Sequence, residues 1–425
     1  MSIYYRDDRV TLYHGDCIEV MASLPDASVD AVVTDPPYAL GFMGRSWDTF
    51  GDVGRGAQAR VQRSGEVTPG GEGHSTSAGP YLASGVDSLR SAGAPFQAWC
   101  EQWAREALRV LKPGGHLLAF GGTRTWHRLA CAVEDAGFEV RDSIAWLYGS
   151  GFPKSHNLTD ENGDRTGWGT ALKPAFEPVV VARKPLAGTV AANVLQYGTG
   201  ALNIDACRVS SSEEDKRKHS AAAGAWTRHG EAHGGRRAVY GTYGNDPSTP
   251  HEAGRWPANV VLDETQAEAL DEQSGDTTRY FQAPRQGDGK SIDGSVFGQH
   301  AGDGIGYNDT GGASRYFYVA KADASERPRV NGTAHPTVKP LALMRYLARL
   351  VTPPGGTILE PFAGSGTTVE ACLLEGFHCI AIEKTDEYLP LTVARIYRQR
   401  HPVEAVKLAG DDLGLFAHID EEATG

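Results

Sequence analysis

Short apolar runs alternate with amphipathic helical patterns at both ends of this 425-residue chain. This alternation predicts a mostly parallel β-sheet with helices on both faces, because parallel neighbours need a crossover connection that is usually a helix. Strands are expected over 9–16, 28–34, 116–122, 138–149, 176–185, 357–362 and 378–384, and helices over 17–25, 96–115, 125–138, 340–356, 367–376 and 386–400. Gly114-Gly115 is the predicted stop of the helix over 96–115.

Two long stretches interrupt this alternation. Residues 41–95 form a predicted loop. Over residues 186–333 the regular apolar pattern is lost, and Gly, Ser, Asp and Arg predominate, with scattered aromatic residues. The strands over 138–149 and 176–185 are joined by a loop rather than a helix, so we expect them to pair antiparallel. The chain therefore divides into a first half-domain over 1–185, a middle region over 186–333, a second half-domain over 334–401 and a tail over 402–425.

Composition and charge exclude several classes of protein. The formal net charge of −12 argues against non-specific coating of nucleic acid. A basic stretch over 183–240, with nine Arg and Lys against five Asp and Glu, fits a local basic face and a solvated surface loop equally well. No apolar run approaches the ~20 residues of a membrane span, and the polar start indicates no signal peptide, so a cytoplasmic protein is expected. The six cysteines show neither a CxxC pair nor metal-ligand spacing, which predicts reduced thiols and no metal site.

The stretch ILEPFAGSGTT has the layout of a nucleotide-binding turn. A strand ends near Phe362, Gly364 and Gly366 let the backbone turn tightly beside a ligand, and a helix begins near Thr367. Glu383 closes the next strand, roughly 20 residues on, where an acid can bind ribose hydroxyls. Alone, this pattern also fits a dinucleotide-dependent dehydrogenase, or a glycine-rich connection that lets a helix pack close to a sheet.

An acid, two prolines and an aromatic residue, Asp35-Pro36-Pro37-Tyr38, directly follow a buried apolar strand. Proline has no N–H, so this tetrapeptide must lie beyond the strand, with a stiff backbone. The combination suits the alkylation of an exocyclic amine on a nucleobase. Asp35 and the Pro36 carbonyl can accept its two N–H bonds and localise the nitrogen lone pair, while Tyr38 stacks on the base. A proline-rich turn that merely caps the strand is the alternative.

Together with a third motif, these two motifs resemble those of the amino-methyltransferases that act on N6 of adenine or N4 of cytosine in DNA. The order of the three motifs along the chain is that of the circularly permuted β-group. The motifs run Asp35-Pro36-Pro37-Tyr38, then His335-Pro336-Thr337-Val338-Lys339-Pro340, then Phe362-Ala363-Gly364-Ser365-Gly366. The resemblance implies an α/β, Rossmann-like, S-adenosylmethionine-dependent methyltransferase fold. Its seven-stranded, mostly parallel sheet would carry family strands three to seven first in the chain and strands one and two last, with an inserted target-recognition region over 186–333.

The resemblance also implies roles for single residues. In the family, the acid matching Asp16 lies near the adenine of S-adenosylmethionine, and the acid matching Glu383 holds its ribose. Residues matching His335, Thr337 and Lys339 serve the amino-acid end of the cofactor. The positive charge of the Lys339 ammonium suits the carboxylate of the cofactor there. The remaining cofactor residues are expected to be Glu360, Phe362, Ala363, Gly364, Ser365, Gly366 and Thr367.

Duplex DNA is the expected partner, and its target base must be flipped out to reach such a site. Ribosomal-RNA and protein-glutamine methyltransferases share a D/NPPY-type turn, but their glycine loop precedes it, whereas here it follows by more than 300 residues. Adenine is favoured over cytosine, because cytosine-N4 members more often carry Ser at the position of Asp35.

A catalytically inactive DNA-binding protein is a third alternative. The resemblance is consistent with a bacterial or phage enzyme that stands alone or has a cognate restriction endonuclease, and with a monomer or a homodimer. Residues 285–314 fit either target recognition or a disordered insertion.

Overall fold

The computed structural model describes residues 1–40, 48, 86–151, 155, 157–158, 166–211, 252–275, 311–320, 326–330 and 332–400. Most of the predicted loop over 41–95, the second half of the basic stretch, residues 285–310 of the stretch over 285–314 and the predicted tail lie outside these residues. Among the helices of the described ranges, none combines the length and the hydrophobicity that a membrane crossing requires.

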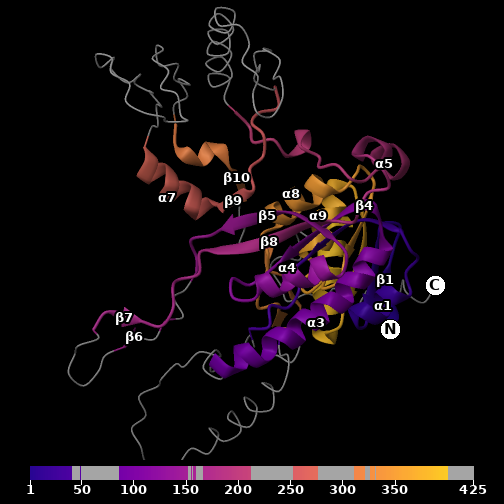
Figure 1. The fold of residues 1–425 in the computed structure, drawn as a ribbon, viewed down its shortest axis with the longest axis horizontal. Coiled ribbons are helices and arrows are strands. Elements are labelled where there is room, and N and C mark those ends of the chain that lie inside the picture. The colour runs from indigo at the N-terminus through magenta and orange to yellow at the C-terminus, as the bar shows by residue number, and fades with distance from the viewer. Residues whose placement is uncertain are drawn as a thin grey trace, which may run out of the picture.

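Within the described residues, ten strands form one mixed, mostly parallel sheet (Figure 1). Neighbouring strands run parallel except at β1 and β8, which are antiparallel to their neighbours. The strand order is β1 (Ser2–Arg6), β2 (Val10–His14), β14 (His378–Glu383), β13 (Thr357–Glu360), β3 (Val29–Thr34), β4 (Leu111–Phe120), β8 (Phe176–Arg183), β5 (Glu139–Leu147), β9 (Val260–Asp263) and β10 (Tyr318–Ala320).

The seven strands from β2 across to β5 are those expected from the sequence, and their order confirms the predicted permuted fold. The last two strands of the chain, β13 and β14, lie between β2 and β3, so that Ile358 pairs with Ala31 and Cys379 with Val10. The predicted antiparallel pairing of β5 and β8 is also confirmed. Strands β1, β9 and β10 extend the sheet beyond the predicted seven.

Helices cover both faces of the sheet, because alternate strand residues point to opposite faces. Ala31 and Val33 of β3 belong to one hydrophobic core, and Val32 belongs to the other. The first core packs against α8 (Leu341–Val351), α9 (Thr367–Glu375) and α10 (Leu389–Arg400), and the second against α1 (Cys17–Ala22), α3 (Val86–Val110) and α4 (Trp126–Asp135). Figure 1 shows α3 and α4 on one side of the sheet and α8 and α9 on the other.

The structure corrects two predicted boundaries. Helix α3 begins at Val86, so residues 86–95 are helical rather than part of a loop, and Pro95 lies inside the helix. Gly114 and Gly115 do not stop this helix, which ends at Val110; they lie within β4. Gly114 has φ +77°, and a Cβ there would meet the Asn193 amide nitrogen at 2.4 Å, so close packing and backbone conformation both require glycine.

The middle region contains elements that the sequence pattern did not indicate. These are α5 (Val190–Tyr197), α7 (Glu264–Ser274), the short helices η3 (Asp205–Cys207) and η4 (Ala313–Tyr316), the strands β9 and β10, and β11 (Arg329–Val330), which pairs with β12 (Thr333–Ala334). The predicted loop over 149–175 contains the two-residue strands β6 (Asn157–Leu158) and β7 (Trp168–Gly169), and η6 (Asp386–Tyr388) precedes α10. The strands β9 and β10 add to the edge of the main sheet beside β5.

Candidate active site

A cavity of about 320 Å³ lies where β3, β13 and β14 end, at the carboxyl edge of the sheet. Ligands bind at this edge in open α/β sheets. Both ends of the chain contribute to its walls, because β13 and β14 are inserted beside β3 and β2. Of the predicted site residues, the cavity is lined by Asp16, Asp35, Pro36, Pro37, Tyr38, His335, Thr337, Lys339, Glu360, Phe362, Ala363, Gly364, Ser365, Thr367 and Glu383.

The predicted catalytic tetrapeptide begins directly after β3. The Asp35 side chain is 24% exposed, and its Oδ1 accepts a hydrogen bond of 2.7 Å from the Tyr38 hydroxyl. The Tyr38 carbonyl accepts a bond of 2.7 Å from Thr125 Oγ1, and Asp48 Oδ1 accepts one of 2.6 Å from the Ala39 backbone N–H. The turn is therefore held from both sides, with the Asp35 carboxylate at the cavity.

Lys339 lies against this turn. Its Nζ is 2.8 Å from Asp35 Oδ2, 3.0 Å from Glu177 Oε2 and 3.1 Å from the Tyr38 hydroxyl oxygen. Burial alone would lower the pKa of Lys339, but the charges of Asp35 and Glu177 outweigh it and raise that pKa above its ordinary value. Lys339 was predicted at the amino-acid end of a cofactor, yet the three hydrogens of its ammonium already have acceptors within the chain.

The glycine loop after β13 is tied to the end of β14 through Glu383. The Glu383 carboxylate is 7% exposed and accepts hydrogen bonds from the backbone N–H groups of Gly364 (2.7 Å) and Thr385 (2.6 Å). Burial raises the pKa of Glu383 above its usual value, although these bonds oppose the shift. Glu383 is thus fixed at the end of β14, the strand that follows the glycine loop, where the sequence predicted an acid.

Gly366 has a different environment from the other predicted loop residues. Its φ is +79°, and a Cβ built on it would lie 2.7 Å from the Thr392 Cα of α10. It precedes α9 and faces the packed interface with α10 rather than the cavity. The structure therefore assigns Gly366 to the close packing of two helices, because no side chain fits there.

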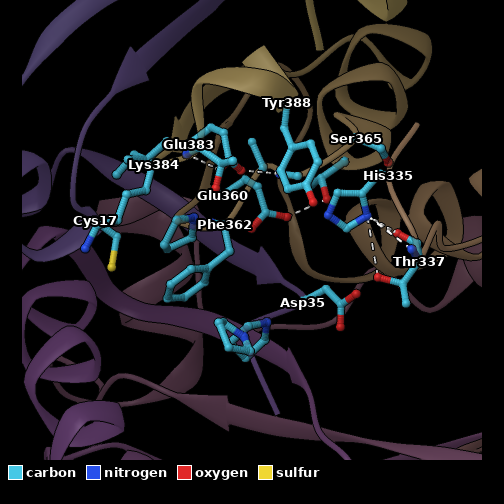
Figure 2. A pocket seen from close by; sticks show the side chains of 18 of the residues that line it. Cys17, Asp35, His335, Thr337, Glu360, Phe362, Ser365, Glu383, Lys384 and Tyr388 are labelled. Carbon is cyan, nitrogen blue, oxygen red and sulfur yellow. Dashed lines mark hydrogen bonds between the residues drawn. The ribbon is translucent and has the colours of Figure 1, made fainter. Parts of the chain in front are cut away.

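The two ends of the cavity carry different groups, as Figure 2 shows. At one end, Asp16 caps α1 by accepting from the Ile18 N–H at 3.0 Å, and its Oδ2 accepts from Lys384 Nζ at 3.0 Å. At the other end, the His335 ring lies beside Thr337 and edge-on to the Tyr388 ring, with centroids 4.5 Å apart. Asp35 lies nearer the His335 end in this view.

Several lining residues were missed by sequence reasoning. Most adjoin a predicted residue, so widening each motif by a residue or two would have found them; Trp99, Met344 and Tyr388 carry no local signal. Trp99 was expected only as an apolar helix position, but its ring lies 5.5 Å from that of Phe362. Burial, reinforced by the Asp16 charge, raises the pKa of the Cys17 thiol to about 12, so it stays protonated and is no nucleophile. The missed residues are Gly15, Cys17, Leu40, Trp99, Met344, Pro361, Thr368, Ile382, Lys384, Thr385 and Tyr388.

Glu360, at the end of β13, is a buried acid with an altered affinity for protons. Its Oε1 accepts hydrogen bonds from Thr34 Oγ1 (2.5 Å) and the Phe362 N–H (3.0 Å), and its Oε2 accepts one from Thr368 Oγ1 (2.6 Å). Burial nevertheless raises the pKa of Glu360 to about 8. At neutral pH this carboxyl is mostly protonated, so in that form its own O–H donates in one of the two contacts with the Thr34 and Thr368 hydroxyls.

The stability of the protein should therefore fall as the pH rises from about 5 to 8. In this window the folded state keeps the Glu360 proton, whereas the unfolded chain releases it near 4.5. The folded state binds more protons, so this group lowers the free energy of unfolding by about 1.4 kcal/mol per pH unit. Glu360→Gln removes the titration, and its melting temperature by calorimetry should vary less with pH than that of the wild type. Identical pH profiles for the two proteins would contradict the assignment.

Comparison with known proteins identifies the family. A model described as DNA methylase, for the N6/N4 type, matches residues 29–394. The chain belongs to this DNA methylase family. This confirms the resemblance seen in the sequence motifs. The chain is similar to the type II methyltransferase M.HindIII of Haemophilus influenzae, with 26% identity over 208 residues, 45% of this chain and 64% of M.HindIII. The chain thus spans less than two thirds of that relative.

Solved structures of DNA methyltransferases also align with this chain. The PvuII DNA methyltransferase, described as cytosine-N4-specific, is 14% identical, with a TM-score of 0.44 over 93% of this chain and 88% of that one. A DNA modification methylase of Thermus thermophilus, complexed with S-adenosyl-L-methionine, is 18% identical, with a TM-score of 0.38 over 92% of this chain and 95% of that one.

Proposed function

We propose that this protein transfers a methyl group from S-adenosylmethionine to the exocyclic N6 of adenine in duplex DNA. The observation that carries the proposal is the single cavity at which Asp35 and the Pro36-Pro37-Tyr38 turn meet the glycine loop and Glu383. One wall offers acceptors for an amine, and the other offers groups for a nucleoside cofactor.

The donor set of the cavity fits S-adenosylmethionine. The Glu383 carboxylate suits two ribose hydroxyls, and Asp16, which lines the same cavity and bonds to Lys384 next to Glu383, would lie near the adenine. The apolar surfaces of Phe362 and Ile382 suit the flat ring system, and His335 lies at the opposite end, where the amino-acid part would bind. When bound, this cofactor supplies a methyl group on a positively charged sulfur.

The residues of the tetrapeptide would hold the target base. The Asp35 carboxylate and the Pro36 carbonyl would accept the two N–H bonds of the amine, which localises the lone pair on its nitrogen. Tyr38, fixed through its hydroxyl and its carbonyl, would offer its ring to the base. The base must leave the duplex, at a cost of a few kcal/mol, and we assign DNA recognition to the middle region over 186–333.

Mass spectrometry of nucleosides tests this proposal. Duplex DNA is incubated with the protein and S-adenosylmethionine, digested and analysed, with RNA and protein as parallel substrates. We expect N6-methyladenine in the DNA digest only. N4-methylcytosine without N6-methyladenine would replace adenine by cytosine as the target, and methylation confined to RNA or protein would contradict a DNA substrate.

A further inference from the structure

Glu177 contacts the tetrapeptide from a strand that carried no predicted site residue. It is the second residue of β8, and its side chain is 21% exposed. Its Oε2 lies 3.0 Å from Lys339 Nζ and 3.1 Å from the Tyr38 hydroxyl. Lys339, only 9% exposed and 4.8 Å from the centre of the Phe120 ring, thus bridges Glu177 and Asp35.

The charges of this cluster do not balance. Asp35 and Glu177 contribute two carboxylates, and Lys339 contributes one ammonium. Burial, together with the charges of Asp35 and Glu177, raises the pKa of Tyr38 well above its ordinary value, so the phenol stays neutral. One net negative charge therefore remains beside the cavity, which Asp35 lines as a partly exposed side chain.

We infer that Glu177 is a positioning residue for methyl transfer: it shares Lys339 with Asp35, so that the ammonium does not by itself neutralise the Asp35 carboxylate. Lys339 then belongs with the target-base side of the site rather than with the cofactor. This inference rests on the proposed function, because it concerns the amine that Asp35 would accept. The amine nitrogen would become positively charged as its bond to the methyl carbon forms and the sulfur–methyl bond breaks, with S-adenosylhomocysteine as the leaving group and the surplus N–H proton then lost to solvent. A fixed negative charge in a buried site stabilises that developing positive charge.

Two single substitutions separate charge from shape. Glu177→Gln keeps an acceptor for Lys339 but leaves the cluster with no net charge. We expect its kcat for DNA methylation to fall about tenfold, less than the ~10²–10³ typical of a group that touches the reacting atoms directly. Lys339→Met removes the ammonium and leaves two neighbouring carboxylates, which favours protonation of one of them. Its pH–rate profile should therefore shift.

The double variant Glu177→Gln/Lys339→Met gives the sharpest test. It returns the cluster to one net negative charge, on Asp35, so its kcat should exceed that of Glu177→Gln alone. A structural role predicts the reverse, since two lost contacts harm folding at least as much as one. If Lys339 instead binds the cofactor, every variant that lacks it will lose affinity for S-adenosylhomocysteine, measured by calorimetry, and the double variant will not recover.

Glu139→Gln serves as the matched control. Glu139 pairs with Arg183 at 2.6 Å, at the other end of the β5–β8 hairpin, so it reports loss of an ion pair in the same hairpin without touching the cluster. Its kcat should match the wild type. The inference is overturned if Glu177→Gln is as active as Glu139→Gln, if it loses S-adenosylhomocysteine binding or its thermal transition, or if the double variant shows no recovery. A wild type without DNA methylation would instead overturn the proposed function.

Discussion

Replacing Asp35 by alanine should lower kcat for DNA methylation by about 10²–10³-fold, equivalent to ~2.7–4 kcal/mol of transition-state stabilisation. The carboxylate faces the cavity and would accept an N–H of the target amine, and in the absence of Asp35 only the Pro36 carbonyl is left to localise the lone pair. Cofactor affinity should change little, because the predicted ribose and adenine groups belong to other elements: Glu383 ends β14 and Asp16 is the N-cap of α1. Single-turnover kinetics at saturating DNA, with calorimetric binding of S-adenosylhomocysteine, would measure both quantities.

Asp35→Asn is the matched variant for this experiment. It keeps the size of the side chain and one carbonyl oxygen, but loses the charge beside Lys339. We expect an activity between those of the wild type and Asp35→Ala, with the cofactor still bound. Turnover near the wild-type rate in Asp35→Ala would show that the carboxylate takes no part in the reaction.

Gly366→Ala should be the most destabilising of the simple glycine substitutions around α9. Alanine at φ +79° costs about 1–2 kcal/mol from its backbone conformation. Its Cβ would also come within 2.7 Å of the Thr392 Cα, and relieving such overpacking costs a further ~1–3 kcal/mol. Since the glycine loop would move with the start of α9, S-adenosylhomocysteine binding should weaken as well. Chemical denaturation and calorimetry measure the two effects.

Gly376→Ala isolates the contribution of the clash. Gly376 ends the same helix with nearly the same φ, +78°, and no atom lies within 4 Å of the Cβ that would be added. This variant should therefore lose only the stability that the left-handed backbone conformation costs an alanine, about 1–2 kcal/mol, and keep its cofactor affinity. Equal losses of stability in the two variants would mean that α9 and α10 can separate at no cost.

The sequence predicted the central sheet because its strands and helices are marked by neighbouring residues: apolar runs alternate with helical patterns, and glycine and proline residues lie between them. Asp35, Phe362 and Glu383 were found because each ends or follows an apolar strand, and strand ends meet at one edge of a parallel sheet. The start of α3 was misplaced because residues 86–95 continue a stretch rich in Gly, Ser and Ala without an apolar period, yet the helix includes them and Pro95.

Other features depend on contacts between distant segments. Glu177 follows Phe176 at the start of an apolar strand and reads locally as a solvated strand end; only the pairing of β8 with β4 and β5 brings it to Lys339. In the same way, the short strands β9 and β10 lack a local pattern, and an existing edge at β5 gives them partners.

A crystal structure with sinefungin, an analogue of S-adenosylmethionine in which a carbon atom bearing an amine replaces the sulfur and its methyl group, tests the central claim most directly. That claim is that one crevice, built from both ends of the chain, aims the methyl donor at the proline-stiffened turn. We predict the ribose of sinefungin on Glu383 and its amine directed at Asp35 and the Pro36 carbonyl. A ligand bound elsewhere, or one whose amine is directed away from Asp35, would contradict the account.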